Sequence, residues 1–235
     1  QGLVKLNKRN LKVEPLLAKS ISINDDGTLY TFNLRDSVFF HDDPCFPDGK
    51  GRMLNANDVK YCFDQLCSSI DGNRTSSYFT SIVLGAQEHY AATAKGEYPE
   101  GGVKGVKVVD DFTITIELVS SYSYFLKILS HACCTIYPKE AYDEYGLDLR
   151  AHTVGTGPFI LKNKDINENV ELRMVRNDNY WENDEYGNPL PYLDVIKISF
   201  NNNKKIELTN FKKGNIDMVY QLPVEELEAV LVTLD

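Results

Sequence analysis

The sequence predicts an α+β protein in which mixed sheets are flanked by helices. Two stretches, 28–35 and 112–119, alternate apolar and polar residues with the period of a half-buried strand. A third stretch, which begins at Asn55, spaces its apolar residues as a helix does. Predicted strands and helices are intermixed without the regular βαβαβ rhythm of a doubly wound sheet, and this favours α+β.

In the first half of the chain, Tyr30, Phe32 and Leu34 share one face of the strand 28–35, which follows the turn signal Asn24-Asp25-Asp26-Gly27. A helix should begin at Asn55, whose side chain can cap the free amide of Asp58. Its apolar stripe is Val59, Cys62, Phe63, Leu66 and Ile70. A second helix is expected from about 77 to 95, with Gly96 as its stop.

The second half continues the intermixed pattern. Strands are expected at 103–109, 112–119, 159–162, 170–176, 195–200 and 215–220. Helices are expected at 122–130, at 138–145 with a proline in the first turn, and from about 204 to Gly214. An amphipathic segment follows Pro223, with Glu225 and Glu226 in its first turn.

Composition excludes several classes of function. The 235 residues include 25 Lys plus Arg against 34 Asp plus Glu, so the formal net charge is −9. Proteins that bind nucleic acid or anionic membranes normally carry a basic field, so we expect no nucleic-acid partner. No stretch approaches the roughly 18 apolar residues that cross a bilayer. The start at Gln1 has no initiator Met and no signal-like apolar region, so we expect a fragment or a processed form.

The five cysteines imply no disulfide framework, and their odd number leaves at least one thiol unpaired within the chain. Cys62 and Cys67 point to different faces of the predicted helix, and adjacent Cys133 and Cys134 would need a strained ring. Cys45 lies in the loop before that helix and could reach Cys67 in an oxidising compartment. Because no C-x-x-C occurs, zinc ribbons and thioredoxin-like chemistry are not supported.

No constellation of residues predicts catalysis, a metal or a cofactor. The run 41–45 (His-Asp-Asp-Pro-Cys) matches no metal-ligand spacing and is interpreted as a turn after a strand. The run 155–158 (Gly-Thr-Gly-Pro) is expected to be a tight turn, because Pro158 prevents a helix from offering free amides to a phosphate. The histidines show no nucleophile–base spacing, and the acidic pairs lie in turns. The residues alone therefore indicate an acidic α+β protein that is not an enzyme.

Eight short segments follow one another along nearly the whole chain: 13–20 (VEPLLAKS), 26–35 (DGTLYTFNLR), 38–42 (VFFHD), 54–59 (LNANDV), 154–159 (VGTGPF), 176–181 (RNDNYW), 191–194 (PYLD) and 211–217 (FKKGNID). In this order they resemble extracellular solute-binding proteins of the oligopeptide/dipeptide type, which feed ABC importers. Asn55 stands where the family usually has Thr, and Asn215 where Glu is usual. The insertion 43–52 departs from the shorter family loop and has no role that we can assign from the sequence.

The resemblance implies a periplasmic-binding-protein (clamshell) architecture, two lobes that close around a cleft. By analogy this chain is a fragment that holds most of lobe one. Residues 1–119 would form its N-terminal subdomain, 120–222 a base subdomain, and 223–235 the crossover into a second lobe that the chain lacks. The same analogy places the first strand and the C-terminal return of lobe one outside the chain.

The resemblance also implies a function without catalysis: capture of oligopeptides or dipeptides in the periplasm or outside the cell and delivery to a membrane permease, with no cofactor and with a possible lipid anchor at a missing N-terminus. Tyr220, at the crossover, is the first candidate for ligand contact, with hinge packing as its alternative. Tyr78 is the second, with core packing as its alternative.

Two other functions stay open at this point. One is a hydrolase acting on cell-wall or peptide material, which the lack of a nucleophilic or metal set argues against. The other is a sensory or adaptor domain with the same fold, bound to a membrane signalling protein instead of a permease.

Overall fold

The computed structural model describes residues 1–221, and within that part the strands form three sheets. The strands are β1 (Val4–Leu6), β2 (Val13–Pro15), β3 (Ala18–Ile23), β4 (Leu29–Leu34), β5 (Val106–Asp110), β6 (Thr113–Glu117), β7 (Phe159–Ile160), β8 (Ile166–Asn167), β9 (Glu171–Arg176) and β10 (Val195–Ser199). The α-helices are α1 (Ala56–Leu66), α2 (Ala86–Thr93), α3 (Phe125–Leu129), α4 (Lys139–Tyr145) and α5 (Lys204–Lys212). The α+β class with flanking helices is confirmed, and the pairings between these strands are antiparallel.

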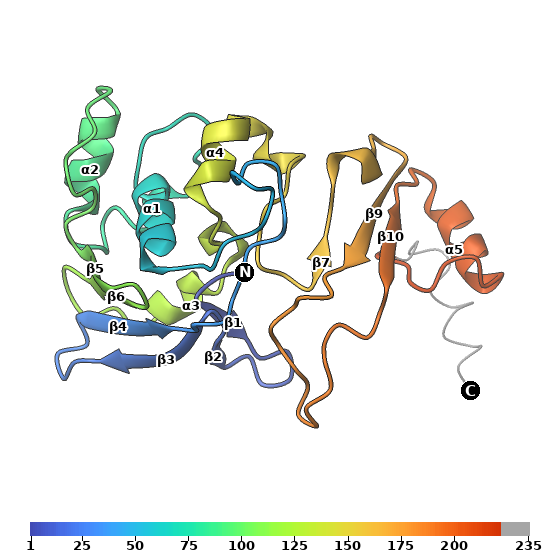
Figure 1. Cartoon of the computed structure of the whole chain (residues 1–235), viewed down its shortest axis with the longest axis horizontal. Helices are drawn as coiled ribbons and strands as arrows, with labels where there is room; N and C mark the ends of the chain where they lie inside the picture. Colours follow the sequence, from blue (N-terminus) through green and yellow to red (C-terminus); the bar gives the residue numbers. More distant parts are fainter. Residues whose placement is uncertain (222–235) are drawn as a thin grey trace.

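A four-stranded sheet in the order β3-β4-β6-β5 forms one end of the molecule, with α1 lying over it (Figure 1). The predicted alternation of 28–35 is confirmed, because Tyr30, Phe32 and Leu34 are buried on the side of the core. Phe32 pairs with Ile114 of β6, and both side chains are fully buried. The turn before β4 also forms as expected: the Asn24 side chain accepts hydrogen bonds from the backbone N–H groups of residues 28 and 29.

Helix α1 begins where the sequence indicates. The Asn55 side chain accepts a hydrogen bond from the N–H of Asn57, and the Asp58 carboxylate accepts one from the N–H of Asn55, which closes a capping box. The helix buries Val59, Cys62 and Phe63 against the sheet. Cap and stripe together therefore fix both the start and the orientation of α1.

The continuous helix expected from 77 to 95 is wrong. The chain instead makes a 3₁₀ turn at Ser76–Tyr78, an isolated bridge between Val83 and Leu118, and then the shorter helix α2. Gly85 precedes α2 with a left-handed φ of 75°, a backbone conformation that interrupts a helix. Phe79 and Val83, two apolar residues of the expected helix, are buried in the segment before α2, where Val83 bridges to Leu118 at the end of the sheet.

The helices expected at 122–130 and 138–145 form in shortened versions, α3 and α4. The segment 125–134 packs with earlier elements: α3 contacts β1, and the 3₁₀ turn Ala132–Cys134 contacts α1. Phe125 and Ile136 belong to the same buried cluster as Phe32. One core thus includes residues from both sides of position 119, and the division into 1–119 and 120–222 stays a prediction.

The third sheet, β7, β9 and β10 with β8 beside β9, lies toward the other end, with α5 next to β10 (Figure 1). The strands expected at 159–162, 170–176 and 195–200 are confirmed with shorter bounds, as is the helix from 204. The strand expected at 215–220 is wrong: this segment makes no ladder within the described residues, and Met218 is 77% exposed. A strand needs a hydrogen-bonded neighbour, and the described part of the chain offers none there. The amphipathic segment from Pro223 lies outside the described residues.

Candidate ligand-binding site

Tyr78, the second ligand-contact candidate, lies on the surface and is positioned by its neighbour in sequence. The 3₁₀ turn Ser76–Tyr78 leads directly into Phe79, which is fully buried and packs edge-on against Phe63 with ring centroids 6.0 Å apart. Tyr78 itself is 47% exposed, and its ring meets that of His131 at 6.3 Å. This exposure does not fit the core-packing alternative, whereas the ligand role stays a prediction.

Tyr220, the first candidate, is 83% exposed near the end of the described residues. No hydrogen bond or ring contact between Tyr220 and Tyr78 is present in residues 1–221. The structure therefore does not bring the two candidates into one contact, and the role of Tyr220 stays a prediction as well.

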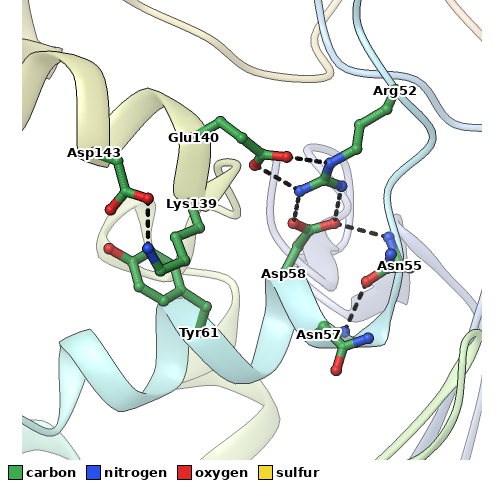
Figure 2. A pocket seen from close by; sticks show the side chains of 8 residues that line it. All are labelled: Arg52, Asn55, Asn57, Asp58, Tyr61, Lys139, Glu140 and Asp143. Carbon is green, nitrogen blue, oxygen red and sulfur yellow. Dashed lines mark hydrogen bonds and ion pairs between the residues drawn. The ribbon is translucent and has the colours of Figure 1, made fainter. Parts of the chain in front are cut away.

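A cavity of about 340 Å³ lies where the N-terminal ends of α1 and α4 meet (Figure 2). At its centre, the Arg52 guanidinium donates to both oxygens of Asp58, at 2.9 and 2.7 Å, and to both oxygens of Glu140, at 2.6 and 2.8 Å. Asp58 is 3% exposed. Figure 2 shows that Lys139 and Asp143 of α4 pair with each other beside Tyr61.

The charges around this cavity are satisfied by one another. Hydrogen bonds with Asp58 and then Glu140 raise the pKa of Arg52, and the hydrogen bond with Arg52 lowers the pKa of Glu140. Lys139 is likewise paired, with Asp143. A ligand charge entering here would have to displace a bidentate pair, so we interpret the cluster as a brace between α1 and α4.

The insertion 43–52, which has no role assigned from sequence, supplies part of this brace. Besides Arg52, it buries Phe46, whose ring lies 6.2 Å from that of Phe40. Tyr145, at the end of α4, donates from its hydroxyl to Asp43 at 2.7 Å. The insertion therefore fastens to α4 at both ends. Sequence reasoning missed this because Arg52 and Glu140 lie 88 residues apart.

The run 41–45 is a loop, and residues 1–221 contain no cluster that could hold a metal ion. His41 is buried, and its ring Nε2 lies 2.8 Å from the carbonyl oxygen of Gly157. The backbone N–H of His41 donates to the carbonyl of Gly155. The amide of Asn177 also donates to Gly157, at 3.1 Å. The glycine-rich segment is therefore a bend held by its neighbours, in agreement with the turn expected from the sequence.

A second cavity, of about 470 Å³, lies between the loop of the β1–β2 hairpin and the loop 183–192. Lys5 donates to Glu182 at 2.6 Å across this junction. Asp184 accepts hydrogen bonds from the Tyr192 hydroxyl and from Asn188, which lower its pKa to about 2. This is a solvated cleft between two loops with mixed charge.

The expected Cys45–Cys67 disulfide is wrong, because all five cysteines are free thiols. Cys45 sits near Glu140, at the N-terminal end of α1, whereas Cys67 caps the other end of that helix. Eleven helical residues separate these ends by about 16 Å. A disulfide requires Cα atoms within about 7 Å. The Cys133 and Cys134 sulfurs lie 3.8 Å apart as free thiols that share a hydrogen bond.

Comparison with known proteins decides the family. The model of the bacterial extracellular solute-binding proteins, family 5 (middle), matches residues 12–233. This chain belongs to solute-binding family 5. Membership confirms the resemblance drawn from the eight segments. It places the chain in a family of solute-binding transport proteins.

Several family 5 members are similar to this chain over nearly its whole length. The glutathione-binding protein GsiB of Salmonella typhi is 30% identical over 229 residues, which cover 96% of this chain and 37% of GsiB. Heme-binding protein A of Haemophilus influenzae is 33% identical over 222 residues, covering 92% and 37%. A periplasmic oligopeptide-binding protein of Borrelia burgdorferi has the same fold, with a TM-score of 0.81 at 24% identity, covering 98% of this chain and 43% of that one.

The chain thus spans well under half the length of the family 5 relatives that it matches. This share is consistent with one lobe of the two-lobed architecture that the resemblance implies. No helix within residues 1–221 combines the length and the apolar character needed to cross a membrane.

Proposed function

We propose that this chain forms lobe one of the substrate-binding component of an ABC importer, and that the whole protein captures short peptides or peptide-like molecules. The family match over residues 12–233 carries the proposal. The family is extracellular, so the protein would act in the periplasm or outside the cell, and a lipid anchor belongs to this proposal. Its partners would be the ligand, a membrane permease and the second lobe of its own chain.

The mechanism that we propose needs no bond-making. An extended peptide is held largely through its main chain, while its side chains occupy solvated pockets that tolerate many sequences. Ligand contacts that exist only when both lobes are present shift the equilibrium toward the closed form, which the permease distinguishes from the open one. Tyr220 and Tyr78 are the contacts proposed for this lobe, and both offer amphipathic rings at the surface.

The domain organisation follows the same proposal. Residues 1–119 and 120–222 would be the two subdomains of lobe one, and 223–235 would lead into lobe two. The protein would need no cofactor and would catalyse no reaction.

Calorimetric titration of the full-length protein with a pool of short peptides tests the proposal. We expect dissociation constants of about 1 µM or tighter, which correspond to roughly −8 kcal/mol. Mass spectrometry of the recovered peptides should show them intact. Absence of binding to any peptide would contradict the proposed ligand class, and cleaved peptides would contradict a purely binding role.

A further inference from the structure

Tyr78 has a neighbour on the surface that sequence reasoning did not single out. His131 follows α3, and its ring meets that of Tyr78 at a centroid distance of 6.3 Å and an interplanar angle of 63°. Both side chains are exposed. Two aromatic rings from distant parts of the sequence thus form an edge-to-face pair at the surface, a favoured geometry for such rings.

The orientation of the His131 ring is fixed by a second contact. Its Nδ1 accepts a hydrogen bond from the backbone N–H of Cys133 at 3.3 Å, which caps the 3₁₀ turn Ala132–Cys134. An imidazole nitrogen that accepts in this way carries no proton, so in the neutral ring the proton lies on Nε2. Within the described residues Nε2 has no hydrogen-bond partner, and its N–H is available to an acceptor outside this lobe.

Both members of the pair are held in place before any ligand arrives. The backbone at Tyr78 is anchored by the buried Phe79 and the Tyr78 ring meets that of His131, which is itself held by the hydrogen bond from Cys133. Side chains that are already ordered lose little conformational entropy on binding, so contacts with them cost less free energy. A fixed donor beside a flat apolar ring suits a peptide, which offers a main-chain carbonyl at every residue and a side chain next to it.

We propose that Tyr78 and His131 act as one ligand contact, in which Nε2–H of His131 donates to a main-chain carbonyl of the bound peptide and the Tyr78 ring packs against the neighbouring side chain. This inference rests on the proposed function, because it takes the ligand to be a peptide. It adds His131 as a ligand-contact residue of lobe one.

Two substitutions of His131 separate ligand contact from local structure. In His131→Asn the side-chain oxygen can still accept from the N–H of Cys133, but the outward donor is lost. In His131→Gln the amide nitrogen reaches about as far as Nε2 and keeps that donor. Tyr78→Ala removes the ring, and Tyr98→Ala serves as the control because Tyr98 is 70% exposed and makes no ring contact within the described residues.

The experiment measures the affinity of the full-length variants for the tripeptide Ala-Phe-Ala by calorimetry, with melting curves to confirm folding. Loss of one hydrogen bond predicts a decrease in affinity of roughly 3- to 10-fold for His131→Asn. We expect a similar or larger decrease for Tyr78→Ala, and a change of less than about 2-fold for His131→Gln and Tyr98→Ala.

If the wild type binds the tripeptide and both His131→Asn and Tyr78→Ala bind as tightly, the inference is wrong while the proposed function stands. A decrease for His131→Gln equal to that for His131→Asn would also overturn it, since the outward donor would then be irrelevant. A wild-type protein that binds no peptide would overturn the proposed function, and this inference with it.

Discussion

Replacing Asp58 by alanine should destabilise the chain far more than breaking an exposed ion pair such as Lys139–Asp143. The Asp58 carboxylate is 3% exposed and accepts three hydrogen bonds, two from the Arg52 guanidinium and one from the N–H of Asn55 at 2.9 Å. The substitution therefore breaks the capping box of α1 and half of the brace between α1 and α4.

The magnitude follows from these contacts. Breaking a buried ion pair costs about 3–5 kcal/mol, and losing the hydrogen bond from the N–H of Asn55 costs about 1 kcal/mol, while the Asn55 side chain still caps α1. Two features reduce the sum: the Arg52 side chain is 35% exposed, so water solvates it, and it keeps its bidentate pair with Glu140. We therefore expect Asp58→Ala to lower the free energy of unfolding by about 3 kcal/mol. Asp58→Asn, which keeps one acceptor but no charge, should cost about 2 kcal/mol.

Urea unfolding followed by far-UV circular dichroism measures these differences. The matched control is Asp143→Ala, which removes the i,i+4 partner of Lys139, a pair in which both side chains are more than half exposed. Exposed pairs of this kind contribute about 0.3–0.5 kcal/mol. A cost for Asp58→Ala no larger than that of Asp143→Ala would refute the brace.

Two further predictions concern single groups. Burial lowers the pKa of His41, and its Nδ1 has no hydrogen-bond partner within the described residues, so protonation is disfavoured in the folded state. The free energy of unfolding should thus fall as the pH drops below about 6.5, the pKa of histidine in the unfolded chain. Urea unfolding of His41→Gln should show a smaller decrease in stability between pH 7.5 and 5.5 than the wild type. A decrease equal to that of the wild type would contradict this. Ellman's reagent should count five thiols in the denatured chain without reductant. Burial raises the pKa of Cys62 and Cys67 to about 12, so these two thiols should react slowly in the native state. A count below five would mean that the chain forms a disulfide that the structure lacks.

Local signals in the sequence predict the local structure well. The alternation in 28–35 and the cap at Asn55 each depend on residues within a few positions, and both form as expected. The helix expected over 77–95 fails because the bridge from Val83 to Leu118 uses a partner 35 positions away that no local pattern reveals.

The candidate site shows the same limit. The resemblance drew attention to Tyr78, but nothing in the sequence places His131 against it, because the contact joins two turns that lie 53 positions apart, Ser76–Tyr78 and the turn that His131 caps. The brace of Arg52 with Glu140 is non-local for the same reason. Cys45 and Cys67 do not pair because the whole length of α1 lies between them.

The proposal that binding depends on two lobes is tested most directly by comparing the affinity of this 235-residue chain with that of the full-length protein for the same peptide. Enclosure between lobes predicts that the chain alone binds at least about 100-fold more weakly, a difference of roughly 2.7 kcal/mol. Equal dissociation constants in the two titrations would show that this chain holds a complete site by itself, and would contradict the account.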